Sequence, residues 1–211
     1  MQKLIHNKQI LILFFIAYST ISCSSQRNRS TLSYQANCGY VVNQKLCSIE
    51  LPDQYNDIRN ITEFNDSVTV LQFSTMWCHA CTEAAYESAN IKKIYESSLT
   101  YAIILLDSYD VGVNPTHDDV FGWAQKNGIA GPVLQGSSEL IDTKELNGFG
   151  IDVFPTFYII GKNNTILAKL SGGEDLVYYV NKLGFGQNQN DMPTPQEEQE
   201  DKGCLPPGAD E

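Results

Sequence analysis

Two cysteines lie where an apolar segment meets the start of a helix, and this arrangement restricts the fold more than any other feature of the sequence. Residues 68–73 read Val-Thr-Val-Leu-Gln-Phe, and 77–81 read Trp-Cys-His-Ala-Cys. A cysteine at a helix N-terminus meets unpaired backbone N–H groups and the positive end of the helix dipole, which favour the thiolate. We therefore predict a redox site in which Cys78 is the nucleophile and Cys81, one turn later, closes a disulfide with it.

A Cys-x-x-Cys pair also occurs in zinc sites and in structural disulfides. Tetrahedral zinc needs two further ligands, and the sequence has no second Cys-x-x-Cys and no His-x3-His pair. No metal ligands are therefore predicted. A strand followed at once by an amphipathic helix favours the redox interpretation over a structural disulfide.

The N-terminus predicts export from the cytoplasm. Lys3 and Lys8 precede an apolar run at 10–17 that is too short to span a bilayer, so 1–22 is interpreted as a signal peptide. Its end, Ser22-Cys23, resembles a bacterial lipoprotein signal, although Thr20 stands where leucine is usual. The resemblance implies acylation of Cys23 and a membrane anchor, and Ser24 resembles the outer-membrane sorting signal of cells with two membranes. An ordinary cleaved signal, giving a secreted or periplasmic protein, is the alternative.

The remaining cysteines are odd in number. Of six cysteines, Cys23 is assigned to the lipid, which leaves five. Because thiols outside the cytoplasm are usually oxidised, Cys38 and Cys47 are expected to form a structural disulfide. Cys204 is then left free, paired with another molecule, or paired with Cys23 if that residue is not acylated.

Charge and composition divide the chain. Removal of 1–22 takes away two lysines and changes the net charge from −11 to −13, so nucleic acid is not an expected partner. The polar stretch 23–37 is predicted to be a flexible tether, and 186–211, acidic and with several prolines, a disordered tail. Residues 38–185 are long enough for one core.

Hydrophobic periodicity predicts an α/β domain. We expect strands at 48–51, 68–74, 101–106, 132–134, 156–160 and 165–170. Helices are expected at 79–97, 118–127 and 174–183, a weaker helix at 140–146, a turn or short helix at 61–64 and a hairpin turn at 162–164. This order indicates a three-layer sandwich with a mixed sheet flanked by helices.

The order of elements resembles the thioredoxin fold. The motif at 77–81 matches the thioredoxin active site, and Val153-Phe154-Pro155-Thr156 matches the loop whose proline is cis. The additional chain between these two motifs resembles the extracytoplasmic TlpA/ResA-like branch. Residues 51–53 and 61–64 also resemble this branch. This resemblance covers about 47–183 and implies a thiol–disulfide oxidoreductase in which the backbone of Phe154, turned outward by a cis Pro155, pairs with an extended substrate.

Departures from the family pattern concern the groups around the cysteines. Gln72 stands in the place of a buried aspartate and cannot take a proton. Ala84 stands where this branch often has glutamate, and Tyr86 replaces a usual proline. Glu83 falls four residues after His79, which places the two within pairing distance on one helical face and, with Trp77, where they can tune the cysteines; an ordinary solvated carboxylate is the alternative for Glu83.

The predicted function is a membrane-tethered thiol–disulfide oxidoreductase acting on disulfide-bearing or dithiol proteins of the cell envelope, with an unidentified redox partner and no cofactor. Reduction is the expected direction by family resemblance, and a protonated His79 beside Cys78 favours oxidation instead. A copper chaperone and a thiol peroxidase of related fold are the alternatives. The sequence does not specify the substrate, the electron donor or the roles of Cys204 and the tail.

Overall fold

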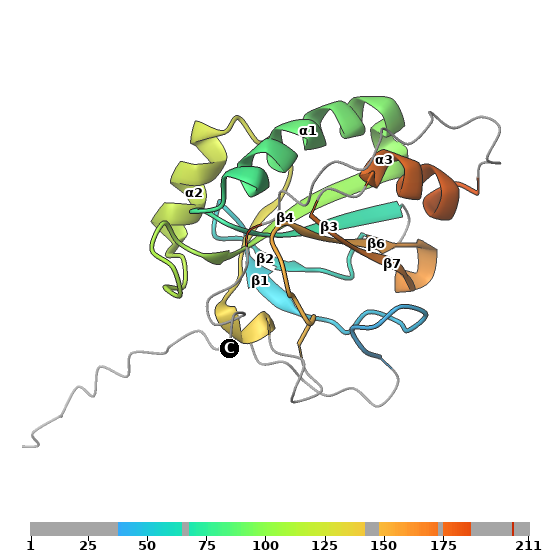
Figure 1. Cartoon of the computed structure of the whole chain (residues 1–211), viewed down its shortest axis with the longest axis horizontal. Coiled ribbons are helices and arrows are strands. Elements are labelled where there is room, and N and C mark those ends of the chain that lie inside the picture. The colour runs from blue at the N-terminus through green and yellow to red at the C-terminus, as the bar shows by residue number, and fades with distance from the viewer. Residues whose placement is uncertain (1–37, 65–67, 142–147, 173–174, 187–203, 205–211) are drawn as a thin grey trace, which may run out of the picture.

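The computed structural model describes residues 38–64, 68–141, 148–172, 175–186 and 204. Its centre is a five-stranded sheet in the order β5-β4-β3-β6-β7 (Figure 1). The strands are β3 (Val68–Thr75), β4 (Leu99–Asp107), β5 (Val133–Gln135), β6 (Thr156–Ile160) and β7 (Ile166–Ser171). β3, β4 and β5 run parallel, and β6 and β7 are antiparallel to their neighbours.

The two central strands are buried on both faces. Every residue of β3 is buried, as is every residue of β4 except Thr100. This burial explains why these segments read as continuous apolar runs rather than as alternating ones. Alternate side chains of β3 therefore enter two separate cores, with Val70 in one and Leu71 in the other.

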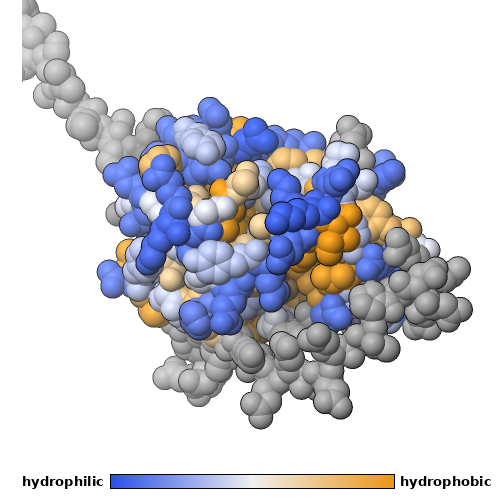
Figure 2. All heavy atoms as spheres, turned by 90° about the horizontal axis from the view of Figure 1, so that it is seen from above, coloured by the Kyte–Doolittle hydropathy of each residue, from blue (hydrophilic) through white to orange (hydrophobic). Residues whose placement is uncertain are grey.

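The helices α1 (His79–Tyr95), α2 (His117–Lys126) and α3 (Leu176–Tyr179) cover one face of the sheet (Figure 1). A short 3₁₀ helix, Glu96–Ser98, follows α1, and a π-helical segment, Val180–Gly184, extends α3. α2 begins with a capping box in which the side chains of Thr116 and Asp119 each bind the other's backbone N–H. The outer surface seen from this side is mainly hydrophilic with apolar patches (Figure 2).

The opposite face is covered mostly by chain that precedes β3. The strands β1 (Glu50–Pro52) and β2 (Ile58–Asn60) form a hairpin, and a 3₁₀ helix lies at Ser138–Leu140. Phe149 packs between the rings of Tyr40, Phe73 and Tyr158. The second core is therefore built from segments far apart in the sequence.

The mixed α/β fold class is confirmed, and individual elements differ from prediction. The strand predicted at 48–51 lies at Glu50–Pro52 because pairing with β2 begins at Glu50, and β2 itself is not predicted. The segment 61–64 is a turn, and 162–164 is a 3₁₀ turn in which Asn163 and Asn164 have positive φ. The helix predicted at 140–146 falls largely on 142–147, outside the described residues, as do the predicted signal peptide, Cys23 and the tether.

Candidate redox site

Cys78 is the N-cap of α1, as the motif predicts. Its backbone is extended, with φ −85° and ψ 115°, and no side chain of the described residues caps this end of the helix. β3 ends irregularly at Thr75, and the N–H of Met76 donates to the carbonyl of Asp107 at 3.2 Å. The strand thus delivers the cysteine to a helix N-terminus with first-turn N–H groups available to a thiolate.

The disulfide of the site joins Cys78 to Cys204, with their Cα atoms 5.9 Å apart. The sequence leaves Cys204 free, paired with another molecule or paired with Cys23, and the structure corrects this by bonding Cys204 to Cys78. The disulfide exchange between Cys78 and Cys81 stays a prediction. Cys81 is a free, buried thiol. The pairing joins residues 126 positions apart, a separation over which sequence periodicity carries no information.

The backbone of Phe154 faces the same sulfur atoms. The Phe154–Pro155 peptide bond is cis. Phe154 N–H donates to the Cys204 carbonyl at 2.5 Å, and Cys204 N–H donates to the Phe154 carbonyl at 2.5 Å. The Cys78 sulfur lies 3.8 Å from that carbonyl oxygen. Cys204 is thus one residue of an antiparallel bridge placed directly beside Cys78.

Cys81 lies in a desolvated environment. Burial raises its pKa from 9.0 to about 12, and the nearby backbone of Thr75 and the hydroxyls of Ser74 and Thr75 lower the pKa only in part. The Cys81 thiol is therefore protonated at neutral pH, in contrast to what a helix N-terminus favours for Cys78.

Gln72 connects β3 to the first turn of α1 through hydrogen bonds of its side-chain amide. Its amide nitrogen donates to the Ser74 hydroxyl at 2.7 Å and to the Cys81 carbonyl at 3.0 Å. Its amide oxygen accepts from the Tyr101 hydroxyl at 2.6 Å. A neutral amide thus occupies this buried position, so it holds the first turn of α1 without taking part in proton transfer.

Asp107 is a site residue that the sequence does not predict. It is buried at the end of β4, and its Oδ2 accepts from the Trp77 indole N–H at 3.1 Å and from the Gly112 N–H at 3.0 Å. Trp77 in turn packs edge-to-face on Phe154, with ring centroids 6.0 Å apart. Asp107 therefore positions both the motif tryptophan and the loop after β4. A single aspartate closing a buried apolar strand is the sequence signal that could have indicated it.

His79 and Glu83 form the contact expected from their spacing. His79 Nε2 lies 3.3 Å from Glu83 Oε1, and the two side chains are 87% and 57% exposed. An exposed pair of this kind contributes little to stability because water and salt screen it.

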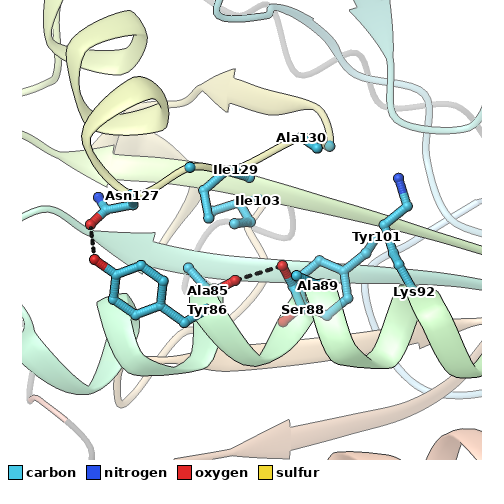
Figure 3. Close-up of a pocket in the computed structure, with 12 residues that line it drawn as sticks. Ala85, Tyr86, Ser88, Ala89, Lys92, Tyr101, Ile103, Asn127, Ile129 and Ala130 are labelled. Atoms are coloured by element: carbon cyan, nitrogen blue, oxygen red, sulfur yellow. Dashed lines mark hydrogen bonds between the residues drawn. The ribbon is translucent and has the colours of Figure 1, made fainter.

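A separate cavity of about 100 Å³ lies between α1, β4 and residues 127–131 (Figure 3). Tyr86 lines it and donates to Asn127 Oδ1 at 2.9 Å. The lining begins at Ala85, beyond both motif cysteines, so this cavity does not belong to the redox site.

The structure also pairs Cys38 with Cys47, Cα atoms 4.9 Å apart. Within the described residues, no three His, Cys, Asp or Glu side chains gather as metal ligands do. None of the helices in the described part of the chain has the length and apolar character needed to span a membrane.

Comparisons with known proteins identify the fold. No protein-family model matches the chain, and no curated protein does. Solved structures do match. A thiol:disulfide interchange protein of the thioredoxin family from Chlorobium tepidum is 17% identical, with TM-score 0.51 over 63% of this chain and 88% of that one. The exposed lipoprotein thioredoxin Etrx1 of Streptococcus pneumoniae is 18% identical, with TM-score 0.50 over 61% and 92%.

A thiol-disulfide oxidoreductase from Bacteroides fragilis is also similar, with 18% identity and TM-score 0.52 over 66% of this chain and 99% of that one. At such identities the likeness concerns the arrangement of the backbone. The five-stranded mixed sheet and its helices agree with these structures, and the chain has the thioredoxin-like fold.

Proposed function

We propose that the protein is a thiol–disulfide oxidoreductase that uses Cys78 as nucleophile and Cys81 as resolving thiol. The observation that carries the proposal is the position of Cys78, at the N-cap of α1 and 3.8 Å from the carbonyl of Phe154, with the buried Cys81 one turn behind it. The helix end favours a Cys78 thiolate, while burial keeps Cys81 protonated until it resolves a mixed disulfide.

The reaction needs no cofactor, because the protein exchanges one disulfide for another. The Cys78 thiolate attacks a substrate disulfide, forming a mixed disulfide and releasing one substrate thiolate. The Cys81 thiolate then attacks the Cys78 sulfur and releases the second substrate thiolate. The substrate is reduced, the Cys78/Cys81 pair is oxidised, and a separate dithiol donor restores the pair.

Substrates of the proposed enzyme are disulfide-bearing proteins of the cell envelope. The basic and apolar N-terminus, Cys23 and the Cys38–Cys47 disulfide support a location outside the cytoplasm. Lipid attachment at Cys23 belongs to the same proposal. Cys23→Ala is expected to move the protein from the membrane fraction to the soluble one, and an unchanged membrane fraction would contradict lipidation.

Reduction of insulin by dithiothreitol tests the activity. Cys78→Ser is expected to abolish the protein's acceleration of insulin precipitation. The matched control is Cys38→Ser/Cys47→Ser, which removes two cysteines away from the site and should retain activity at temperatures where circular dichroism shows it folded. Full activity of Cys78→Ser would overturn the proposal, and tight copper(I) binding that depends on Cys78 and Cys81 would favour the chaperone alternative.

The direction of exchange follows from the reduction potential of the site. Equilibration in glutathione buffers should place it near the thioredoxin end of the known range, about −270 mV, if the protein is a reductase. A value near that of strong oxidants, about −120 mV, would assign it as an oxidase.

A further inference from the structure

Cys204 occupies the position where a substrate of the proposed enzyme would bind. It is bonded to Cys78 and exchanges two backbone hydrogen bonds with Phe154, both 2.5 Å long. We propose that Cys204 is a third redox-active cysteine, and that the Cys78–Cys204 bond is an internal mixed disulfide in which the chain acts as its own substrate. This inference rests on the function proposed above.

The binding mode defines a class of substrate. Phe154 offers its N–H and carbonyl to a single residue, the cysteine itself, as a hydrogen-bonded antiparallel pair. Backbone pairing of this type does not depend on the side chains of the bound segment. The site therefore accepts an extended polypeptide whose cysteine is paired with Phe154, and Cys204 satisfies this requirement from within the chain.

Burial shows what the internal disulfide does to the site. With Cys204 bound, Cys78 is 1% exposed and Cys81 is fully buried, while Cys204 is only partly buried. In this state Cys78 is buried and has no free thiolate with which to attack an external disulfide. A small thiol can reach the Cys204 side of the bond more readily. The internal disulfide thus protects the nucleophile, and external substrates must compete with Cys204 for it.

The site can therefore exist in two states that each contain one disulfide, either Cys78–Cys204 or Cys78–Cys81. These two states are at the same oxidation level. The Cys81 thiolate attacks the Cys78 sulfur, the Cys78–Cys81 bond forms, and the Cys78–Cys204 bond breaks. Cys204 leaves as a thiolate and takes up a proton, which balances the one lost from Cys81. No oxidant is consumed. Cys81 is a free, buried thiol while Cys78 is bonded to Cys204, so Cys81 must lose its proton before it attacks the Cys78 sulfur, and the Cys78–Cys204 state persists until then.

Disulfide mapping tests the inference on the full mature chain. The reduced protein is oxidised with glutathione disulfide, quenched with acid at successive times, alkylated and digested for mass spectrometry. Wild type should yield peptides linked by Cys78–Cys204 before those linked by Cys78–Cys81, and Cys81→Ser should retain only the Cys78–Cys204 link at this site. Exclusive formation of Cys78–Cys81 at all times, with a stable glutathione adduct on Cys81→Ser, would overturn the inference.

Competition provides a second readout. A tethered thiol acts at an effective concentration of about 1 mM. With reduced glutathione at about 0.1 mM and glutathione disulfide in excess, Cys81→Ser/Cys204→Ser should therefore carry roughly tenfold more glutathione on Cys78 than Cys81→Ser does, because the tethered Cys204 thiol competes with reduced glutathione for the Cys78 sulfur. The matched control removes Cys38 and Cys47 from the Cys81→Ser protein and should leave the adduct at its low level. Equal levels of glutathione on Cys78 in Cys81→Ser and Cys81→Ser/Cys204→Ser would contradict the proposal.

The two proposals fail in distinguishable ways. If Cys78→Ser still reduces insulin, the proposed function is wrong and the inference falls with it. If Cys78→Ser is inactive and no peptide links Cys78 to Cys204, the oxidoreductase assignment stands and only the role of Cys204 is overturned.

Discussion

At the scale of single residues, the two cysteines of the motif differ through their surroundings. Cys78 is the N-cap of α1, whereas burial raises the pKa of Cys81 to about 12. Two thiols of the same intrinsic chemistry, one turn apart, are thereby assigned different roles: one is favoured as a thiolate, and the other is kept as a thiol.

The first prediction concerns the ionisation of Cys81. In Cys78→Ser/Cys204→Ser, Cys81 has no partner within the site, so its reaction with iodoacetamide reports its thiolate fraction. Because burial disfavours the charged form, the rate should rise about tenfold per pH unit well beyond pH 9 and level off towards pH 12. N-acetylcysteine, the solution control, should level off near pH 9. A Cys81 profile that levels off with the control would show that the thiol is not desolvated.

The second prediction concerns Asp107. Asp107→Ala removes the acceptor of the Trp77 and Gly112 N–H groups and should lower the free energy of unfolding by about 1–3 kcal/mol. Trp77 should also become more mobile, which fluorescence anisotropy would detect. Urea unfolding measures the loss. The control is Asp110→Ala, an exposed carboxylate in the same loop, expected to change stability by less than about 0.5 kcal/mol. Equal effects of the two substitutions would refute the positioning role.

At the scale of elements, β3 and α1 are joined by more than their connecting residues. Gln72 lies within β3 and binds the Cys81 carbonyl in the first turn of α1, and Tyr101 of β4 binds Gln72. This network fixes the N-terminus of α1 over the centre of the sheet. Because all of its groups are buried, losing a member leaves others without partners.

The third prediction tests this network. Gln72→Met keeps the volume and removes the partners of Ser74, Cys81 and Tyr101, so the free energy of unfolding should fall by about 2–4 kcal/mol. Tyr101→Phe removes one hydrogen bond and should cost about 1–2 kcal/mol. Both are measured by urea unfolding. A Gln72→Met protein as stable as Tyr101→Phe would show that the contact with α1 contributes nothing.

At the scale of the whole molecule, the segment before β1 pairs with the start of the edge strand β7. Asn43, Gln44 and Leu46 form backbone hydrogen bonds with residues 164–166 at the start of β7. The Cys38–Cys47 disulfide ties this segment into a short loop. The start of the edge strand β7 is thereby paired, which shortens the edge that is open to other chains.

The fourth prediction concerns this disulfide. Cys38→Ala/Cys47→Ala should lower the free energy of unfolding by about 2–3 kcal/mol, as expected from chain entropy for a loop closed over a separation of 9 residues. Thermal unfolding monitored by circular dichroism measures the change. Activity per folded molecule should be retained because the loop lies away from Cys78. A loss of insulin reduction at full helix content would instead connect this loop to the site.

The sequence by itself determined the elements that local pattern encodes. The continuous apolar runs of β3 and β4, the amphipathic periodicity of α1 and the cysteine at its N-terminus are properties of neighbouring residues, and the fold class follows from their order. The expected approach of His79 to Glu83 is equally local, because four residues make one helical turn.

Only the tertiary structure decided which groups meet at the site. Cys204 reaches Cys78 across 126 residues, and Asp107 reaches Trp77 across 30. Neither contact has a periodicity or spacing that a sequence can display, because each depends on where the sheet places the end of one strand and the loop of another. The composition of 186–211 predicts a disordered tail. It gives no sign that Cys204 within this stretch pairs with Phe154, because that pairing uses only backbone groups.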